Sequence, residues 1–358
     1  MDISRKNQEQ IAGDNSTQNQ VVGTQNNTYV TVTGASIPDV TEFTTTVSKQ
    51  VTQQALSLCT QVAYDVALKR MQEFESVWIP RVEHMEKAID NFADPKFQFM
   101  LRDANITAAK SSRKEDLSML SELLACHIEK GNDIKIDAGI NKAISIVNEV
   151  DIDSLCALTV VLCVLNIVPV NGNIDDGLNV LNELYAKLLP QPLPEGDAWI
   201  DNLNVVGAIN ILTGNFPKFD ELLSTRLEGY LCVGIKSGTR EHERALEILE
   251  QNHFSKEFLR PHELLPEYLR LSVVDCSNSQ EKLKPIFALY SKDKSLMQTV
   301  RSNFMSKWNS YQVLRTVKEW FDEIPFFIKV NSVGKALAQT NAKRCYPEFP
   351  DLREFGIS

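Results

Sequence analysis

The sequence lacks the short motifs by which many catalytic and nucleotide-binding sites are recognised. It contains none of the patterns HExxH, CxxC, GxxxxGK[ST] or GxGxxG, which place metal ligands or phosphate-binding backbone at fixed spacings. Histidine is also scarce, with five among 358 residues. These absences argue against a zinc enzyme, a P-loop nucleotidase and a dinucleotide-binding domain. We therefore expect no metal ion and no cofactor, and we assign no catalytic residue.

Cysteines are few and show no paired spacing. The seven cysteines stand singly, several of them within apolar runs where a free thiol behaves as a small hydrophobe. This usage is typical of a reducing compartment. The first ten residues, MDISRKNQEQ, lack the apolar stretch of a secretory signal. We predict a cytoplasmic protein.

A long apolar run and an excess of basic residues are also absent. The most apolar stretch, Leu155 to Val170, is interrupted by Asn166 and Pro169 and is shorter than the roughly 20 residues that cross a bilayer. It predicts a buried core helix. The formal net charge of -10 argues against general attraction to nucleic acid or to an anionic membrane. We expect neither as a partner.

The first segment of the chain, residues 1–37, differs from everything that follows. It is rich in Asn, Gln, Thr, Ser and Gly, so an isolated copy buries too little apolar surface to offset its ordering entropy. The unit Gln10-Ile11-Ala12-Gly13 recurs as Gln20-Val21-Val22-Gly23, and Tyr29 to Gly34 alternates β-forming residues. Short strands of this kind expose edges that another chain can pair, and Asn and Gln side chains stack into ladders between chains.

This pattern predicts self-association and hence a homo-oligomer. The alternative is a polar tail without a role. The residues expected to pair between chains are Gln10, Ile11, Gly13, Asn15, Gln20, Val21, Val22, Gly23, Asn26, Tyr29, Val30 and Val32.

From Pro38 onward the apolar residues recur with a helical period. One long amphipathic helix is predicted by apolar residues that recur every three or four positions from Phe43 to Val66. Asp94-Pro95 predicts the start of another helix, because an N-cap residue precedes proline at the first helical position. Ser112 to Glu115 has the form of a capping box. Helices are expected near residues 112–131, 136–147, 155–170, 175–188, 203–212, 222–234, 241–251, 279–290, 311–321 and 333–341.

We therefore predict an all-α fold, either an irregular helical bundle or an α-solenoid, with a short N-terminal β-prone segment. Residues 1–37 form the assembly segment, 38–270 a helical body that begins with the long amphipathic helix, and 271–358 a C-terminal helical region. The proline-rich stretch from Pro190 to Pro194 is the clearest break within the body.

Two groups of residues are candidates for a catalytic or nucleic-acid-binding site. Cys126 and His127 are adjacent, so a helix points them about 100 degrees apart, and a core cysteine beside a surface histidine is favoured over a nucleophilic pair. The stretch 282–318 combines basic and aromatic residues, which can track a phosphate backbone and stack bases. The solvated face of an acidic protein is the favoured alternative. The nucleic-acid candidates are Lys282, Lys284, Arg301, Lys307, Trp308 and Arg315.

Two parts of the sequence resemble known proteins. Gly13 to Gln18 and Val22 to Asn27 are similar to the Asn/Gln/Gly amyloid-signalling motifs of bacteria, and more distantly to fungal prion-forming motifs. In those systems the motif joins a receptor to a helical effector domain. The helical part resembles an uncharacterised bacterial family that pairs such a tail with an all-α body. The resemblance is carried by Phe97 to Leu101, by Ala108 to Lys110 with Asp116-Leu117, and by Ala157-Leu158.

The resemblance implies a fold but no activity. An association of some relatives of that family with antiviral defence suggests the same setting for this protein. We predict a non-enzymatic assembly protein whose N-terminal segment brings helical bodies together, in bacterial antiviral defence. Two alternatives stay open: an enzyme, nuclease-like or other, with dispersed catalytic residues, and a membrane-active effector that releases Leu155 to Val170 or the long helix. Amyloid effectors usually carry the motif at the end opposite a membrane-active helix, whereas here the tail leads the chain, which argues against pore formation.

Overall fold

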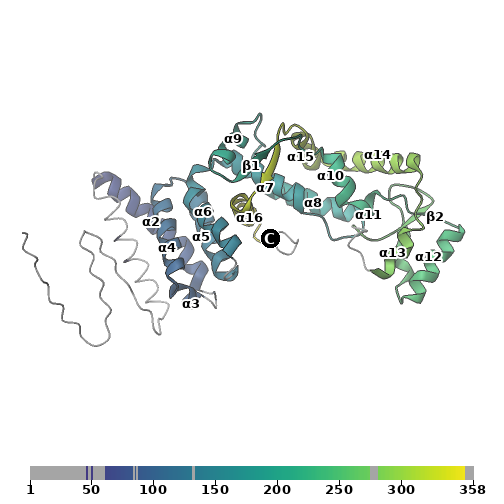
Figure 1. The fold of residues 1–358 in the computed structure, drawn as a ribbon, viewed down its shortest axis with the longest axis horizontal. Helices are drawn as coiled ribbons and strands as arrows, with labels where there is room; N and C mark the ends of the chain where they lie inside the picture. Colours follow the sequence, from purple (N-terminus) through teal and green to yellow (C-terminus); the bar gives the residue numbers. More distant parts are fainter. Residues whose placement is uncertain are drawn as a thin grey trace, which may run out of the picture.

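The computed structural model describes residues 46, 50, 61–83, 85, 88–130, 134–274 and 281–350. Residues 1–37, for which a β-prone segment is predicted, and most of the first half of the predicted long helix lie outside this range. The described elements form an elongated array, with α2 to α6 at one end and a small β-containing unit at the other (Figure 1). Helices dominate, and the predicted all-α class is confirmed.

The first half of the described chain is helical throughout. Its elements are α2 (Gln61–Glu83), α3 (Ala88–Phe92), α4 (Pro95–Lys110), α5 (Lys114–Lys130), α6 (Ile134–Ile146), η1 (Val147–Glu149), α7 (Ile152–Asn166), α8 (Ile174–Leu188) and α9 (Ala198–Val205).

The second half mixes helices with short strands. Its elements are β1 (Ile209–Leu212), α10 (Phe219–Arg226), α11 (Glu228–Leu231), β2 (Ile235–Lys236), α12 (Arg240–Gln251), η2 (Lys256–Phe258), β3 (Leu259–Pro261), β4 (Tyr268–Leu271), η3 (Glu281–Leu283), α13 (Lys284–Phe287), α14 (Lys294–Ser310), α15 (Gln312–Asp322), β5 (Phe327–Val330) and α16 (Ser332–Cys345).

Helix α2 packs against α4 and α5 with a different face from the one predicted. Val62 and Val66, expected to point inward, are 73% and 44% exposed, so this part of the prediction was wrong. The residues that do face the core follow a helical period that starts one residue later, about 100° around the helix. They are Ala67, Met71, Phe74, Trp78 and Val82.

The starts of α4 and α5 test the two capping predictions. At α4 the prediction is confirmed: the Asp94 side chain accepts a hydrogen bond from the Lys96 backbone N–H at 2.9 Å, and Pro95 is the first helical residue. At α5 the predicted capping box was wrong, because the helix begins at Lys114 and Ser112 lies one residue too early to be the N-cap. The Asp116 carboxylate is instead held by the side chains of Arg113 and Ser111.

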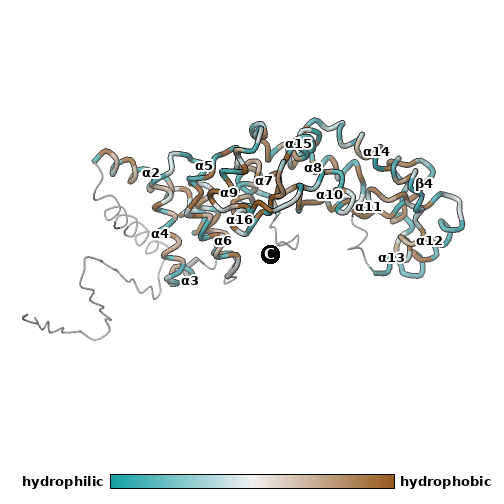
Figure 2. The backbone as a smooth tube through the Cα atoms, turned by 45° about the horizontal axis from the view of Figure 1, so that its top comes forward, coloured by the Kyte–Doolittle hydropathy of each residue, from teal (hydrophilic) through white to brown (hydrophobic). Residues whose placement is uncertain are grey.

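Helix α7 is the centre of the core. Its residues from Ser154 to Val164 are all buried, and Figure 2 shows it as a hydrophobic stretch in the middle of the molecule. The predicted core helix is confirmed, and residues 155–164 of the segment suggested for release onto a membrane are packed inside the protein, whereas Val170 at its end is 94% exposed. Of the helices in the described ranges, none combines the length and apolar character needed to cross a bilayer.

The C-terminal helix α16 returns to the N-terminal half and packs against α5, α6 and α7. One apolar cluster consequently runs from Phe74 on α2 to Phe349 beyond α16. The predicted boundary after residue 270 falls inside β4, and residues beyond it share the core of the residues before it.

A small unit with its own apolar cluster lies at the far end of the array. Strands β2, β4 and β3 form an antiparallel sheet in that order, with Ile235 opposite Leu269 and Leu259 opposite Leu271. Helix α12 and the α13 turn cover it. We call residues 235–274 and 281–290 the small unit. Its buried apolar residues are Ile235, Ala245, Ile248, Leu249, Leu259, Leu271, Leu283 and Ile286.

A second sheet consists of β1 and β5, paired antiparallel from Ile209 opposite Val330 to Leu212 opposite Phe327. The helix predicted over 203–212 was wrong in its second half. Helix α9 ends before Gly207, whose φ of +77° lies in the left-handed region that favours glycine and ends helices. The chain then continues as a strand.

The return of α16 gives a direct test of the shared core. Leu337 on α16 is fully buried, so Leu337→Ala should lower the free energy of unfolding by about 2–5 kcal/mol through lost burial and a cavity. The control Val205→Ala changes a residue that is 84% exposed and should stay within about 0.5 kcal/mol of the parent. Urea unfolding followed by circular dichroism measures both, and equal midpoints would show that α16 is not part of the core.

Candidate functional site

None of the residues predicted to mediate self-association falls within the described residues, because all twelve lie between positions 10 and 32. Their role remains a prediction from the sequence.

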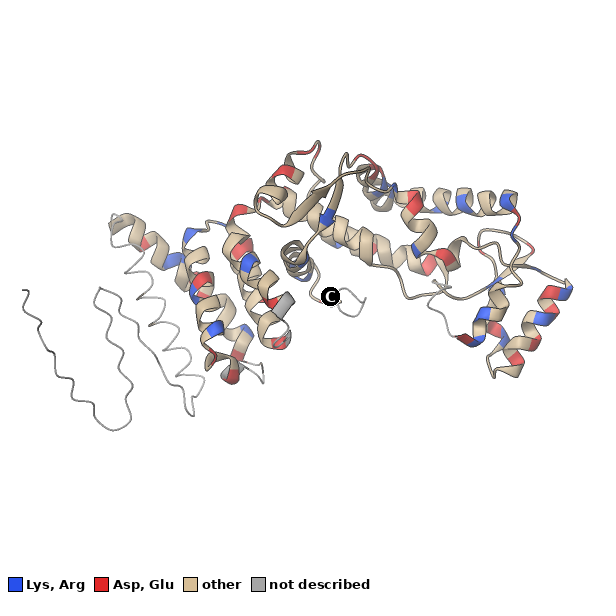
Figure 3. Cartoon of the chain, viewed as in Figure 1, with Lys and Arg blue, Asp and Glu red and all other residues tan. Residues whose placement is uncertain are grey.

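The predicted nucleic-acid residues lie on separate elements. Lys282 and Lys284 belong to the small unit, Arg301 and Lys307 to α14, and Arg315 to α15. Figure 3 shows basic residues along α14. Lys284 pairs with Glu281, and Lys307 pairs with Asp175.

Trp308, the aromatic member of that group, is a core residue. It is 1% exposed, and its indole N–H donates to the carbonyl of Leu314 at 2.8 Å. Its ring packs against Phe219 and Phe304. Trp308 therefore cannot stack on a base while the protein is folded, and its assignment to a nucleic-acid surface was wrong. The spacing that buries it is Val300, Phe304 and Trp308 along one stripe of α14.

His127, expected at the surface, is buried. Helix α5 is packed against α2, α4, α6 and α16. Because neighbouring helices cover it on several sides, Cys126 and His127 are both buried even though they point in different directions. The His127 Nδ1 lies 2.9 Å from an oxygen of Asp137 on α6, and Lys96 pairs with the other oxygen. The histidine is thus engaged by a carboxylate from a neighbouring helix.

An ion pair within the small unit lies where that unit meets the helical body. Arg270 on β4 is 1% exposed, and its Nε and Nη2 donate to the two carboxylate oxygens of Glu263, each at 2.9 Å. The remaining guanidinium N–H groups donate to backbone carbonyls, among them those of Gly229 at 3.2 Å and Gly172 at 2.6 Å. Burial alone would raise the pKa of Glu263, but the hydrogen bonds and charge of Arg270 outweigh it and hold that pKa below its usual value.

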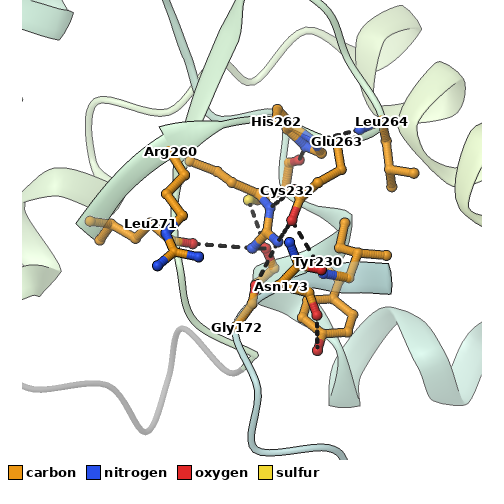
Figure 4. Close-up of polar contacts among 12 residues, drawn as sticks. Gly172, Asn173, Tyr230, Cys232, Arg260, His262, Glu263, Leu264 and Leu271 are labelled. Carbon is orange, nitrogen blue, oxygen red and sulfur yellow. Dashed lines mark hydrogen bonds and ion pairs between the residues drawn. The ribbon is translucent and has the colours of Figure 1, made fainter. Parts of the chain in front are cut away.

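The backbone approaches closely at this junction. A Cβ at Gly229 would overlap the carbonyl oxygen of Val273, and a Cβ at Gly172 would overlap that of Ser272. Both glycines are therefore required by space, since the strand that carries Arg270 lies directly against the body. Figure 4 shows the carbonyl groups and side chains that converge here.

His262 and Cys232 belong to the same junction (Figure 4). The backbone N–H of Leu264 donates to His262 Nδ1 at 3.1 Å, so the neutral ring carries its proton on Nε2, which donates to the Cys232 carbonyl at 2.8 Å. Burial raises the pKa of the Cys232 thiol to about 12. The thiol therefore stays protonated and is a poor nucleophile. The contacts at this junction hold the small unit against the helical body.

The ion pair makes a prediction about stability. Arg270→Met should lower the free energy of unfolding by about 3–5 kcal/mol, because it leaves the partly buried Glu263 carboxylate and the carbonyls of Gly172 and Gly229 without their partner. The matched control Arg244→Met breaks an exposed pair with Glu247 and should cost less than about 1 kcal/mol. Adding Glu263→Gln to Arg270→Met should recover part of the loss. Equal costs for the two single variants would refute the buried pair.

His262 makes the junction sensitive to acid. Burial lowers the pKa of His262 from its ordinary value of 6.5, so below pH 6.5 the unfolded chain binds this proton before the folded chain does. The stabilising contribution of the neutral ring is complete above pH 6.5 and is lost as the pH falls through the folded pKa, by up to about 1.4 kcal/mol per pH unit. Glu263, whose ordinary pKa is 4.5, acts in the same direction at lower pH.

Urea unfolding between pH 7.5 and 5.5 measures this dependence. His262→Gln should be less stable than the parent at pH 7.5 and show a shallower decline on acidification. His253→Asn, at an exposed histidine, should retain the parental decline. A parental slope in His262→Gln would mean that another group titrates.

A cleft with aromatic walls lies between the loop before α9 and the end of α15. Its volume is about 320 Å³. The ring centroids of Trp199 and Trp320 are 5.4 Å apart, with an interplanar angle of 37°. The cleft is lined by Pro194, Gly196, Asp197, Trp199, Trp320, Glu323, Ile324 and Pro325.

Exposed apolar residues lie beside this cleft. Phe326 follows Pro325 and leads into β5, whose first residue pairs with Leu212 at the end of β1. Ile211, Leu212 and Phe326 are all exposed, and β1 is paired along one edge by β5. Among the described residues no strand pairs with the other edge of β1, and such a free edge with apolar side chains is a surface on which another chain can pair.

The sequence did not point to this cleft. Trp199 and Trp320 come from distant parts of the chain and meet because α7 packs against α9 and α8 packs against α15. The only local signal was the proline-rich break, whose last residue, Pro194, accepts a hydrogen bond from the Trp320 indole at 2.8 Å.

The fold and these surfaces define an all-α protein without an evident catalytic centre in the described residues. There, no group of three or more His, Cys, Asp or Glu side chains is placed to hold a metal ion. A protein-family model described only as ":-like", for an uncharacterised family, matches residues 38–355. The chain belongs to this family. No curated protein and no solved structure matches it.

Proposed function

We propose that this protein is a non-enzymatic assembly protein. Its N-terminal residues 10–34 pair between copies and bring the elongated helical bodies together. The observation in the sequence that supports this proposal is the repeated Gln-apolar-apolar-Gly unit at Gln10 and Gln20. It is followed from Tyr29 by a stretch in which β-forming residues alternate. Such units gain backbone and side-chain hydrogen bonds only when strands from several chains stack.

The helical body supports an interaction role through its surface. The exposed part of β1, from Asn210 to Leu212, places a strand edge and two large apolar side chains in contact with solvent. Exposed apolar groups of this kind on a folded body are typical of surfaces that bind other proteins. The body therefore offers a place where a partner can dock once copies are gathered.

The biological setting that we propose is bacterial antiviral defence, acting from the cytoplasm. It rests on the similarity of the segment around Gly13 to Gln18 and Val22 to Asn27 to bacterial amyloid-signalling motifs. In such systems the motif joins a receptor to a helical effector domain.

Light scattering of the full-length protein and of a chain that begins at Pro38, across a range of concentrations, tests the self-association. We expect the full-length protein to form a larger species and the shortened chain to be monomeric. The matched full-length control carries Val22→Lys and Val32→Lys, which place charges on the pairing strands and should also reduce the mass. Equal masses for all three proteins would refute assembly through this segment.

A further inference from the structure

The α9–α15 cleft presents ring faces rather than hydrogen-bond donors. The indole N–H of Trp199 donates to the Gly196 carbonyl at 3.1 Å, and that of Trp320 donates to the Pro194 carbonyl at 2.8 Å. Both polar groups are therefore satisfied within the protein. Trp199 is only 4% exposed, so what remains for a ligand is the accessible part of the half-buried Trp320 ring, and the π-face of an indole attracts cations electrostatically.

The charged residues of the cleft have one sign. Asp197 and Glu323 both line it, both are exposed, and lysine and arginine are absent from its lining. Asp197 sits at the N-cap of α9 without a side-chain capping bond, so its carboxylate is not committed to starting that helix. Figure 3 shows acidic segments before α9 and at the end of α15. Two carboxylates beside two indole rings favour a cationic occupant.

The size of the cleft limits what this occupant is. A volume of about 320 Å³ is at the lower end of small-molecule sites, which span roughly 300–1,000 Å³, and suits a single long side chain. A guanidinium fits this chemistry best, because it stacks on aromatic faces and pairs with carboxylates through two N–H groups at once. The free edge of β1 beside Leu212 and Phe326 provides a surface along which the rest of an extended segment can lie.

We propose that the α9–α15 cleft binds an arginine side chain presented by an extended segment of a partner protein. This inference goes beyond the proposed self-association, because the cleft residues all belong to the helical body. Its affinity comes from the accessible face of Trp320 and from the carboxylates of Asp197 and Glu323, and the strand edge of β1 supports the flanking backbone.

The test uses the full-length protein and a fluorescein-labelled peptide of alternating valine and serine with one central arginine. Fluorescence anisotropy should give tighter binding for this peptide than for the same peptide with citrulline, which has the shape of arginine without its charge, by about tenfold. Equal affinities for the two peptides, or no binding of either, would overturn the proposal.

Paired variants locate the binding. Asp197→Asn with Glu323→Gln removes both charges at exposed positions and should weaken binding of the arginine peptide by about tenfold, while circular dichroism stays unchanged. The matched control, Glu241→Gln with Glu243→Gln on α12, removes the same charge from the small unit and should bind as the parent does. Parental affinity in the cleft variant, or equal losses in the two variants, would exclude the cleft.

Removal of the tryptophan faces gives a second readout. Trp320→Phe keeps an aromatic ring and should bind more tightly than Trp320→Leu, which keeps only apolar bulk. Equal affinities for these two variants would show that the ring face does not contribute.

The same proteins separate this proposal from self-association. The cleft variants should have the parental mass in light scattering, and the chain that begins at Pro38 should retain peptide binding. Loss of binding in that shortened chain would show that the cleft does not act independently of the N-terminal segment, and would contradict the proposal.

Discussion

The burial of α7 is the interaction on which the rest of the described structure depends. This helix is apolar on every side, so folding must cover it completely, and α16, α8 and α9 do so from different parts of the chain. Because α16 comes from near the C-terminus, covering α7 ties the end of the described chain to its first half. The same packing holds α9 and α15 near one another, and so it forms the cleft between Trp199 and Trp320.

The small unit depends on a different kind of contact. Its own apolar cluster is small, and Arg270 and Glu263, which pair with each other inside the unit, also bind backbone groups of the body. Burying two charges is costly unless they are paired and fully hydrogen-bonded, and here carbonyls from Gly172 and Gly229 complete the guanidinium. The unit lies close against the body, since Gly172 and Gly229 leave no space for a Cβ beside the carbonyls of Ser272 and Val273, which follow β4.

The helical elements were largely predictable from the sequence because their signals are local. Asp94-Pro95 marks the start of α4, the apolar run from Leu155 marks α7, and the periodic leucines after Asn173 mark α8. The strands were missed because they have two to four residues, too few to show a period. Each is fixed by a distant partner, as Ile235 is by Leu269.

The candidate sites could be predicted less well, for a physical reason. Whether a helical residue faces solvent depends on how many other helices pack around its own helix. The period of apolar residues in the sequence does not give that number. His127 is buried because α5 is covered on several sides, and Trp308 because it continues the stripe of Val300 and Phe304. The cleft arises from residues far apart in the chain. The self-association residues, in contrast, were proposed from a local repeat, and that proposal is independent of the body.

The central claim is that residues 10–34 gain structure by pairing between copies while the helical body stays as it is. Hydrogen exchange of the full-length protein at low and high concentration, read by mass spectrometry, tests this directly. The account predicts that amides in residues 10–34 become protected at high concentration, whereas those of α7 and α16 exchange equally slowly at both. Rapid, unchanged exchange of residues 10–34 at every concentration would contradict it.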